Sequence, residues 1–262
     1  MTFHRFFAPA KINLFLHVTG RRADGYHLLQ TAFRLLDYGD DIDIAINQSG
    51  EITHANPLPG VPVESDLVIR AARLLQAESG TALGGGSSDA ATVLMALNHL
   101  WGLSFTREQL QALGLRLGAD VPFFIFGRDA FAEGVGEQLQ ALALPEQCYL
   151  VLIPPVSVPT AEIFSSPGLT RNSKPIIMAA FPSSQVRNDL EAVAKEKYPI
   201  IADHLDWLSQ FGKAMMTGSG ACVFAAFNTR KQAESVMKQK PADMQGFIAN
   251  SMKQHPLFGL LD

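Results

Sequence analysis

One stretch of the sequence carries most of the information about the fold: Leu83-Gly84-Gly85-Gly86-Ser87-Ser88-Asp89-Ala90-Ala91. Glycine tolerates positive φ angles, so three in a row let the backbone curl until several N–H groups point at one spot. Ser87 or Ser88 can cap a helix that begins here, and Asp89 suits its first turn. The unpaired N–H groups and the positive end of the helix dipole then favour a bound phosphate.

The residues after the glycines refine this interpretation and leave one alternative. Residues 90–101 are apolar on nearly every face, which is typical of a buried helix. The lysine of a Walker loop is missing, and Asp89 stands where a dinucleotide fingerprint has its third spaced glycine. The alternative is a tight turn that only lets the helix pack closely against its neighbours. The loop alone leaves both interpretations open.

The composition is that of a globular protein with a substantial core. The chain has 262 residues, of which 47% are hydrophobic and 18% charged. A net charge of −4 gives no reason to expect nucleic acid or a membrane surface as a partner. Cys148 and Cys222 are the only cysteines, so we expect no disulfide framework and therefore a cytoplasmic protein. The two cysteines also lack the spacing of a metal site. Nothing in the pattern indicates an oligomeric state.

The hydrophobic pattern predicts an α+β protein that opens with antiparallel strands. Alternation predicts strands at 7–18, 27–36 and 40–46, with a turn at 21–25. Buried strands are expected at 123–126 and 149–153, and further strands at 221–227 and 246–251. Helices are expected at 64–78, 87–101, 106–117, 189–197, 204–211 and 231–238. Prolines at positions 154, 155 and 159 mark a change of segment, which predicts two domains, 1–147 and 148–262.

Lys11 and Asp120 are the polar residues that suggest chemistry. Lys11 lies in an apolar strand on the same face as Asn13, which indicates a wet pocket; an edge lysine that opposes aggregation is the alternative. Asp120 precedes an aromatic run and is either a turn former or a charge at the floor of a cleft. Together they suit phosphoryl transfer, in which a carboxylate accepts the proton of the attacking hydroxyl and a lysine steadies the developing charge.

Aromatic residues and a second glycine-rich turn suggest a site for a base. After the turn at Asp24-Gly25, Tyr26 could stack on a base while His27 reads its edge. The alternative is a half-buried tyrosine with its histidine in solvent. Phe164 is either a core residue or a second stacking face. Another glycine-rich turn precedes a strand and could be only a tight turn: Thr217-Gly218-Ser219-Gly220-Ala221-Cys222.

Taken together, these motifs resemble those of the GHMP kinase superfamily. The resemblance covers nearly the whole chain and includes the 217–222 turn, which is similar to the third motif of the superfamily. It implies two α+β domains with the active site in the cleft between them, and ATP with Mg²⁺ as the phosphoryl source. The four motifs that carry it, in order, are Pro9-Ala10-Lys11-Ile12-Asn13-Leu14, Asp24-Gly25-Tyr26-His27 through Thr31, the Leu83 stretch, and Gly118-Ala119-Asp120-Val121-Pro122-Phe123.

The resemblance also implies a reaction. It is phosphorylation of the 2-hydroxyl of a small alcohol that carries a cytidine diphosphate, within the non-mevalonate route to isoprenoid precursors. Asp120 is implied as the catalytic base and Lys11 as its partner. Tyr26 and Phe164 are implied to sandwich the cytosine, and His27 to read its edge.

Other residues are implied to hold the two substrates, and the resemblance identifies no magnesium ligand. Asn13 is implied to lie beside the alcohol. Further substrate contacts are expected from Thr160, Gly218 and Ser219. The ATP phosphates are expected at Leu83, Gly84, Gly85, Gly86, Ser87, Ser88 and Asp89.

The sequence departs from the superfamily pattern before the glycine run. The family has a longer stretch there, with a strand, a proline and further glycines, where this sequence has only Thr81-Ala82. We expect the protein to contain that stretch, and an intact mass near 28.4 kDa would contradict this. Two other functions are kept as alternatives. One is a kinase for homoserine or mevalonate, which needs no cytosine pocket; the other is a non-catalytic nucleotide-binding protein, which needs no base.

Overall fold

The structure, a computed structural model, describes residues 2–47, 49–57, 62–78, 87–181 and 186–261. These residues form two compact units, each assembled from separate pieces of chain. Unit 1 consists of Met1–Ala10, Tyr38–Arg128 and Lys253–Asp262, and unit 2 of Lys11–Asp37 and Asp129–Met252. The chain therefore passes between the units at four points. None of them is the predicted domain boundary at 147/148, which stays a prediction.

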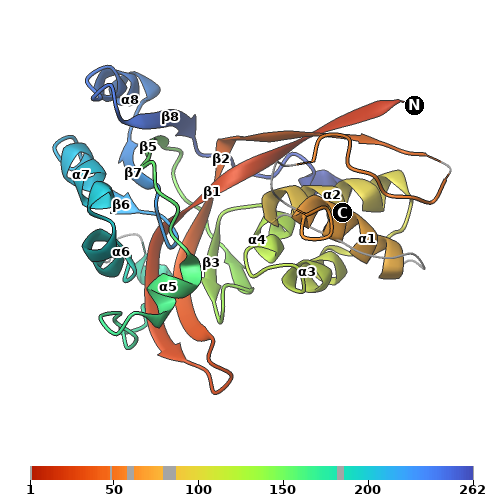
Figure 1. The fold of residues 1–262 in the computed structure, drawn as a ribbon, viewed down its shortest axis with the longest axis horizontal. Helices are drawn as coiled ribbons and strands as arrows, with labels where there is room; N and C mark the ends of the chain where they lie inside the picture. Colours follow the sequence, from red (N-terminus) through yellow and green to blue (C-terminus); the bar gives the residue numbers. More distant parts are fainter. Residues whose placement is uncertain (1, 48, 58–61, 79–86, 182–185, 262) are drawn as a thin grey trace. The chain divides into compact units, whose positions relative to one another are not determined.

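The first sheet is built on two long strands, β1 (Phe3–Arg21) and β2 (His27–Ala45), which appear at the red end of the ribbon in Figure 1. Its order is β1-β2-β3-β4, with β3 (Ala130–Glu133) and β4 (Gln138–Ala141) pairing antiparallel. The predicted strands at 27–36 and 40–46 are one continuous strand. The turn before β2 is confirmed: Gly25 has φ +90°, and its N–H donates to the carbonyl of Arg22 over 3.0 Å.

The second sheet lies in unit 2 and has the order β6-β7-β5-β8, with every pair antiparallel. Its strands are β5 (Cys148–Ile153), β6 (Ala214–Met216), β7 (Val223–Phe227) and β8 (Gln245–Asn250). Strand β5 is buried on both faces, because Leu150 and Leu152 join one core cluster while Tyr149 and Val151 join another. This explains why its sequence is a continuous apolar run rather than an alternating one.

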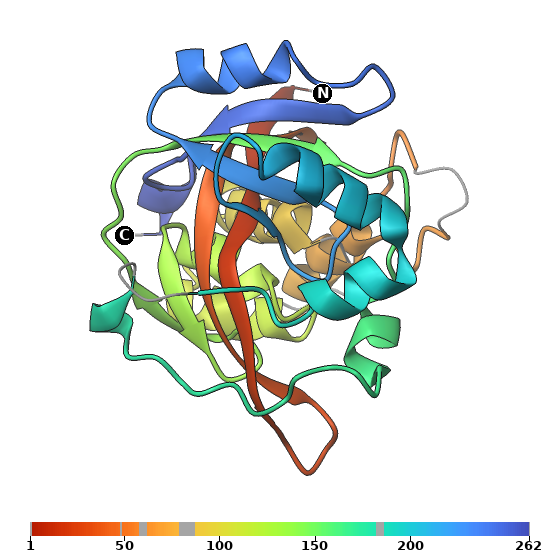
Figure 2. The ribbon, with the colours of Figure 1, turned by 90° about the vertical axis from the view of Figure 1, so that its left-hand side faces the viewer.

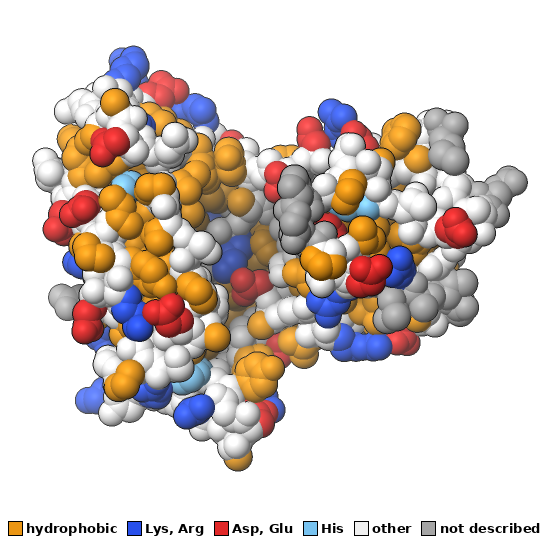
Figure 3. Space-filling model, in the orientation of Figure 1, with side chains coloured by type: hydrophobic (Ala, Val, Ile, Leu, Met, Phe, Trp, Pro, Cys, Tyr) orange, Lys and Arg blue, Asp and Glu red, His pale blue; other side chains and the backbone are white. Residues whose placement is uncertain are grey.

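Helices cover one side of this sheet, as Figure 2 shows for α7 (Pro199–Leu208) and α8 (Arg230–Met237). Ile201 and Leu205 belong to the same core cluster as Leu150, so α7 packs on the sheet through its apolar face. Ile200 and Trp207 are only partly buried there, and Figure 3 shows hydrophobic side chains at the surface of this part of the molecule. The helical segments of unit 2 are α5 (Thr160–Ser165), η1 (Met178–Ala180), α6 (Glu191–Lys197), α7 (Pro199–Leu208) and α8 (Arg230–Met237).

Unit 1 is mainly helical. Asp66 caps α1 (Leu67–Glu78), accepting the N–H of Val68 at 2.7 Å. Helix α3 (Arg107–Leu115) begins with a capping box, because Thr106 accepts from the backbone of Gln109, whose side chain accepts from the backbone of Thr106. The helices are α1 (Leu67–Glu78), α2 (Ser87–Leu100), α3 (Arg107–Leu115), α4 (Val121–Phe126) and the short η2 (Phe258–Leu260).

Two expectations from the sequence are wrong. The strand predicted at 123–126 is part of helix α4, which has Pro122 in its first turn and ends at Gly127 with φ +74°. A short buried apolar run has the same appearance in either structure, so these two residues were the better signal. The full sequence of 262 residues also lacks the longer stretch expected before Leu83: Glu78 and Ser87 are joined by residues 79–86, which lie outside the described residues.

The described helices include none that is long and apolar enough to cross a membrane. Both cysteines are free thiols, and burial raises the pKa of each.

Candidate active site

Lys11 and Asn13 form a hydrogen-bonded pair on β1 in unit 2. Lys11 donates from Nζ to Oδ1 of Asn13 over 2.7 Å, and its ammonium lies 4.8 Å from the ring centre of Phe33. Asn13 is only 3% exposed, and its Nδ2 donates to Oγ1 of Thr31 at 2.8 Å. The backbone N–H of Asn13 donates to Oγ1 of Thr217 at 2.7 Å. Hydrogen bonds therefore fix both the backbone and the side-chain amide of Asn13, and the amide oxygen holds the lysine ammonium in place.

The second glycine-rich turn lies against this pair. Gly218 has φ +58°, and a Cβ at that position would lie 3.8 Å from Oδ1 of Asn13. Nδ2 of Asn188 donates to the carbonyl of Gly218 at 2.8 Å, which anchors the turn. Next along the chain, Oγ of Ser219 lies 2.8 Å from Oγ1 of Thr160 at the start of α5. Four predicted substrate-binding residues are thus brought together in unit 2: Asn13, Thr160, Gly218 and Ser219.

The predicted base-reading residues lie at the other end of α5. The rings of His27 and Phe164 stack with centres 4.9 Å apart and an interplanar angle of 29°. Nε of Arg171 donates to Nε2 of His27 at 3.1 Å. Burial, Arg171 and Arg21 lower the pKa of His27, in that order. Tyr26 is 66% exposed, and in this structure His27 is the ring that stacks on Phe164. The sandwich of a base between Tyr26 and Phe164 stays a prediction.

Arg171 is the residue that sequence reasoning missed. Its Nη1 and Nη2 donate to the carbonyls of Leu169, Phe164 and Ser166 at distances from 2.8 to 3.2 Å. The only available signal was an arginine seven positions after Phe164, in a segment without a recognisable motif. One arginine in an irregular segment is usually solvated, so the pattern alone could not have selected it.

The start of α2 and the turn that carries Asp120 lie together in unit 1. Ser88 donates from Oγ to the carbonyl of Pro9 over 2.8 Å. A Cβ on Gly118 would lie 3.3 Å from Oγ of Ser87, so the turn packs directly on the first turn of α2. Asp120 occupies the N-cap position of α4 but makes no capping hydrogen bond through its side chain. The glycine run itself, Leu83 to Gly86, lies outside the described residues.

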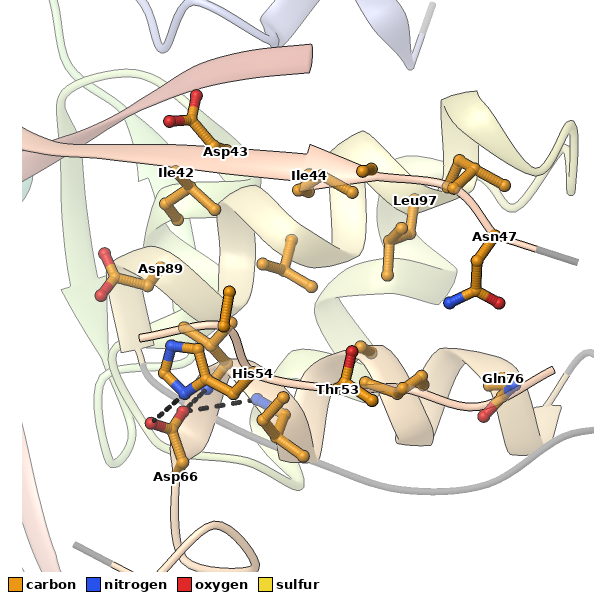
Figure 4. A pocket seen from close by; sticks show the side chains of 18 of the residues that line it. Ile42, Asp43, Ile44, Asn47, Thr53, His54, Asp66, Gln76, Asp89 and Leu97 are labelled. Atoms are coloured by element: carbon orange, nitrogen blue, oxygen red, sulfur yellow. Dashed lines mark hydrogen bonds and ion pairs between the residues drawn. The ribbon is translucent and has the colours of Figure 1, made fainter. Parts of the chain in front are cut away.

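A cavity of about 1250 Å³ opens in unit 1 beside these elements. Figure 4 shows Ile42 and Ile44 of β2 on one side and Leu97 of α2 within the apolar lining. Asp89, in the first turn of α2, lies at one end of the cavity. Burial, Asp40 and Asp66 raise the pKa of Asp89. Nδ1 of His54 lies 3.3 Å from Oδ2 of Asp66 at the same end. Within the described ranges, no group of three His, Cys, Asp or Glu side chains converges as a metal site.

Comparisons with known proteins identify the family of this chain. Residues 62–128 match the GHMP kinases N terminal domain, and residues 167–242 match the GHMP kinases C terminal domain. A 4-diphosphocytidyl-2-C-methyl-D-erythritol kinase of Azoarcus sp. (strain BH72) is 56% identical over 271 aligned positions, covering 97% of this chain and 96% of that protein. A protein of the same name from Dechloromonas aromatica (strain RCB) is 55% identical, covering 95% of this chain and 97% of its own.

Solved structures extend the comparison. A crystal structure of 4-(cytidine 5'-diphospho)-2C-methyl-D-erythritol kinase superposes with a TM-score of 0.78 at 30% identity, covering 95% of this chain and 99% of that one. A mevalonate kinase structure matches with a TM-score of 0.55 at 13% identity, over 96% of this chain and all of that one, which shows a shared fold alone.

The predicted α+β GHMP kinase fold is confirmed. The alignment with the Azoarcus protein spans 271 positions for a chain of 262 residues, so that relative carries residues this chain lacks. The chain belongs to the GHMP kinases, and within them to the family of 4-diphosphocytidyl-2-C-methyl-D-erythritol kinases.

Proposed function

We propose that this chain transfers the γ-phosphoryl group of ATP to the 2-hydroxyl of 4-diphosphocytidyl-2-C-methyl-D-erythritol, in the non-mevalonate route to isoprenoid precursors. The observation that carries the proposal is the pair of sites joined by α5 in unit 2. Phe164 at one end stacks on His27, and Thr160 at the other reaches Ser219 beside the Lys11 and Asn13 pair. A ring-lined site next to a polar site suits an alcohol that carries a base, whereas homoserine and mevalonate carry none.

The residues of unit 1 support binding of ATP. The N–H groups and dipole at the start of α2 attract phosphate, and Ser87 adds a hydroxyl donor, whereas the hydroxyl of Ser88 donates to the carbonyl of Pro9. The apolar walls of the adjacent cavity suit the nucleoside. Its lining includes the carboxylate of Asp66, which can accept from a purine amino group but disfavours phosphate. We therefore assign the nucleoside to the cavity and the phosphates to the glycine run and the start of α2.

Mg²⁺ suits the end of the cavity at which Asp89 lies. This ion takes most of its ligands from nucleotide phosphates and water, so one or two protein oxygens are sufficient. Asp89 offers hard oxygen donors, and its pKa is raised by burial and by Asp40 and Asp66, so a nearby cation stabilises its charged form. When bound, Mg²⁺ offsets the negative charge on the transferred phosphoryl group. The sequence did not identify this ligand.

We assign the chemical roles to Asp120 and Lys11. The carboxylate of Asp120 accepts the proton of the substrate hydroxyl, and the ammonium of Lys11 stabilises the negative charge that develops on the reacting oxygens. Support comes from the bond between Lys11 and Asn13, which fixes the cation, and from the position of Asp120 in the turn that packs on α2. Positioning matters most, because phosphoryl transfer through a loose transition state demands little from the base.

The test is ADP release with ATP, Mg²⁺ and each of three alcohols: the cytidine compound, homoserine and mevalonate. Turnover with the cytidine compound alone supports the proposal. Turnover with a simple alcohol instead would move the chain to another specificity, and nucleotide binding without any turnover would favour the non-catalytic alternative. Because this chain lacks residues that a close relative has, equilibrium binding of an ATP analogue should be measured in parallel.

A matched pair of variants separates base recognition from general stability. Phe164→Leu removes the aromatic face that stacks on His27 and should raise KM for the cytidine compound about tenfold. Phe211→Leu makes the same change where the ring packs on Trp207. It should leave KM unchanged. Equal effects of the two variants would show that Phe164 acts only through the fold.

A further inference from the structure

The tautomer of His27 is set by its neighbour Arg171. A guanidinium Nε–H can only donate, so Nε2 of His27, 3.1 Å away, must accept and carries no proton. Burial, Arg171 and Arg21 all lower the pKa of His27, which favours the neutral ring at neutral pH. A neutral imidazole with an unprotonated Nε2 carries its proton on Nδ1. The ring therefore offers an N–H donor at its free edge.

The guanidinium that imposes this choice is itself held firmly. Nη1 donates to the carbonyl of Leu169 at 3.2 Å, and Nη2 donates to those of Phe164 and Ser166 at 2.9 and 2.8 Å. Two of these acceptors lie at the end of α5, and Phe164 also stacks on the imidazole. The same short segment thus fixes both the plane of the His27 ring and the position of its proton. A lysine could not reproduce this, because its ammonium lacks the planar fork.

Nδ1 of His27 is left for a ligand. Among the residues that the structure describes, none is hydrogen-bonded to this atom, and the ring is only half-buried. A donor at this position distinguishes two otherwise similar bases. Ring atom N3 of cytosine is an acceptor, whereas N3 of uracil carries a hydrogen and would meet the N–H of Nδ1 head-on.

We propose that Arg171 is a positioning residue that makes the substrate site select cytosine over uracil, by holding His27 in the tautomer with its proton on Nδ1. This inference rests on the proposed function, since it requires His27 to face the base of the substrate. Without Arg171 the proton can move to Nε2, and Nδ1 becomes an acceptor that suits uracil. A site built to pair with one hydrogen-bonding edge rejects a base that leaves its groups unpaired.

The first experiment examines the tautomer without substrate or turnover. Histidines are labelled with ¹⁵N, and the His27 signals are assigned from the spectrum of His27→Gln. The native protein should show the Nδ1–H tautomer, and Arg171→Met should show the Nε2–H form. Native His27 with its proton on Nε2, or a tautomer unchanged in Arg171→Met, would overturn the inference. Because activity plays no part here, this result is independent of the proposed function.

The second experiment measures selectivity. KM and kcat are compared for the cytidine compound and its uridine analogue in the native enzyme, Arg171→Met, Arg171→Lys and Arg230→Met. The last is a control, since Arg230 pairs with Glu234 on the surface of α8. Both Arg171 variants should lose roughly tenfold of the preference for cytidine, the loss of one hydrogen bond, mainly through KM. Arg230→Met should keep it.

The outcomes separate the two levels of the argument. A merely structural role of Arg171 would weaken both substrates equally and leave their ratio unchanged, which would overturn the inference. Arg171→Lys keeps the positive charge, so it provides a second measurement if Arg171→Met does not fold. A native enzyme that turns over neither compound would contradict the proposed function, while the ¹⁵N result would still decide the tautomer.

Discussion

His255 links the stability of unit 1 to pH. The side chain is 2% exposed; its Nδ1 accepts the N–H of Leu257 at 3.1 Å, and its Nε2 lies 3.3 Å from Oγ1 of Thr92. Because Nδ1 accepts, the neutral ring carries its proton on Nε2, and a second proton would remove the bond from Leu257. Burial, with a smaller contribution from Arg107, lowers the pKa of His255 to about 4.

The sign and size of the effect follow from proton linkage. An exposed histidine in the unfolded chain has a pKa near 6.5, so between pH 6.5 and 4 the unfolded state binds more protons than the folded state. Stability must therefore fall as pH is lowered through this window. With these two pKa values, His255 alone removes about 2 kcal/mol between pH 7 and pH 5, and about 3 kcal/mol by pH 4.

The assay uses the two tryptophans of the chain, Trp101 in unit 1 and Trp207 in unit 2. In a Trp207→Phe background, urea unfolding followed by Trp101 fluorescence reports on unit 1 at pH 7, 6 and 5. His255→Asn keeps an oxygen that can accept from Leu257 but does not titrate. This variant should be less stable at pH 7, and its loss between pH 7 and pH 5 should be about 2 kcal/mol smaller.

Two comparisons make this result decisive. The raised pKa of Asp89 makes the folded protein more stable on acidification. This contribution is the same with His255 and with His255→Asn, so it cancels from the difference between them. His4→Gln removes an exposed histidine from the same unit and should leave the pH dependence unchanged. If His255→Asn kept the full loss between pH 7 and pH 5, the argument from burial would be refuted.

Three further variants test other parts of the structure. Asp120→Asn should lower kcat by about 10²-fold, the low end for a general base because a loose transition state demands little from it, and a loss of only a few-fold would exclude an essential base. Arg34→Met leaves the buried carboxylate of Asp129, now bonded at 2.9 Å, without its cation. It should cost about 3–5 kcal/mol in urea unfolding, and most of this should return when Asp129→Leu is added. Thr106→Ala removes the cap of α3 and should cost about 1 kcal/mol, a loss that Thr106→Ser should largely avoid.

Elements with strong local signals could be predicted from the sequence. The capping box at Thr106 marks the start of α3, because its two hydrogen bonds depend on only four adjacent residues. Strand β5 was also found, although its burial on both faces removes the alternation. The run at 123–126 has the same apolar character as β5 but is helical, because Pro122 and Gly127 favour that local geometry. Hydrophobicity alone could not distinguish the two.

The sequence named candidate residues for the site but could not give their geometry. Asn13 and Thr217 are 204 positions apart, and only the folded chain brings the backbone of one to the hydroxyl of the other. The rings of His27 and Phe164 stack on each other, which no pattern in the sequence indicates, while the sandwich of a base between Tyr26 and Phe164, implied by the resemblance, stays a prediction. Arg171 acts through a hydrogen bond to another side chain, and such a role leaves no pattern in a single sequence.

Strand β1 explains why these polar groups can be held so rigidly. Ile12 and Phe15 are buried in one core cluster of unit 2 and Leu16 in the other, so the strand is fixed by packing on both sides of Asn13. From this fixed backbone, Asn13 donates hydrogen bonds to Thr31 of β2 and to Thr217 of the glycine-rich turn. The oriented amide oxygen of Asn13 then holds the ammonium of Lys11. Where the transition state is loose, a cation already in position contributes more than a strong base. The apolar residues of β1 are, on this argument, as necessary to the reaction as the lysine they hold in place.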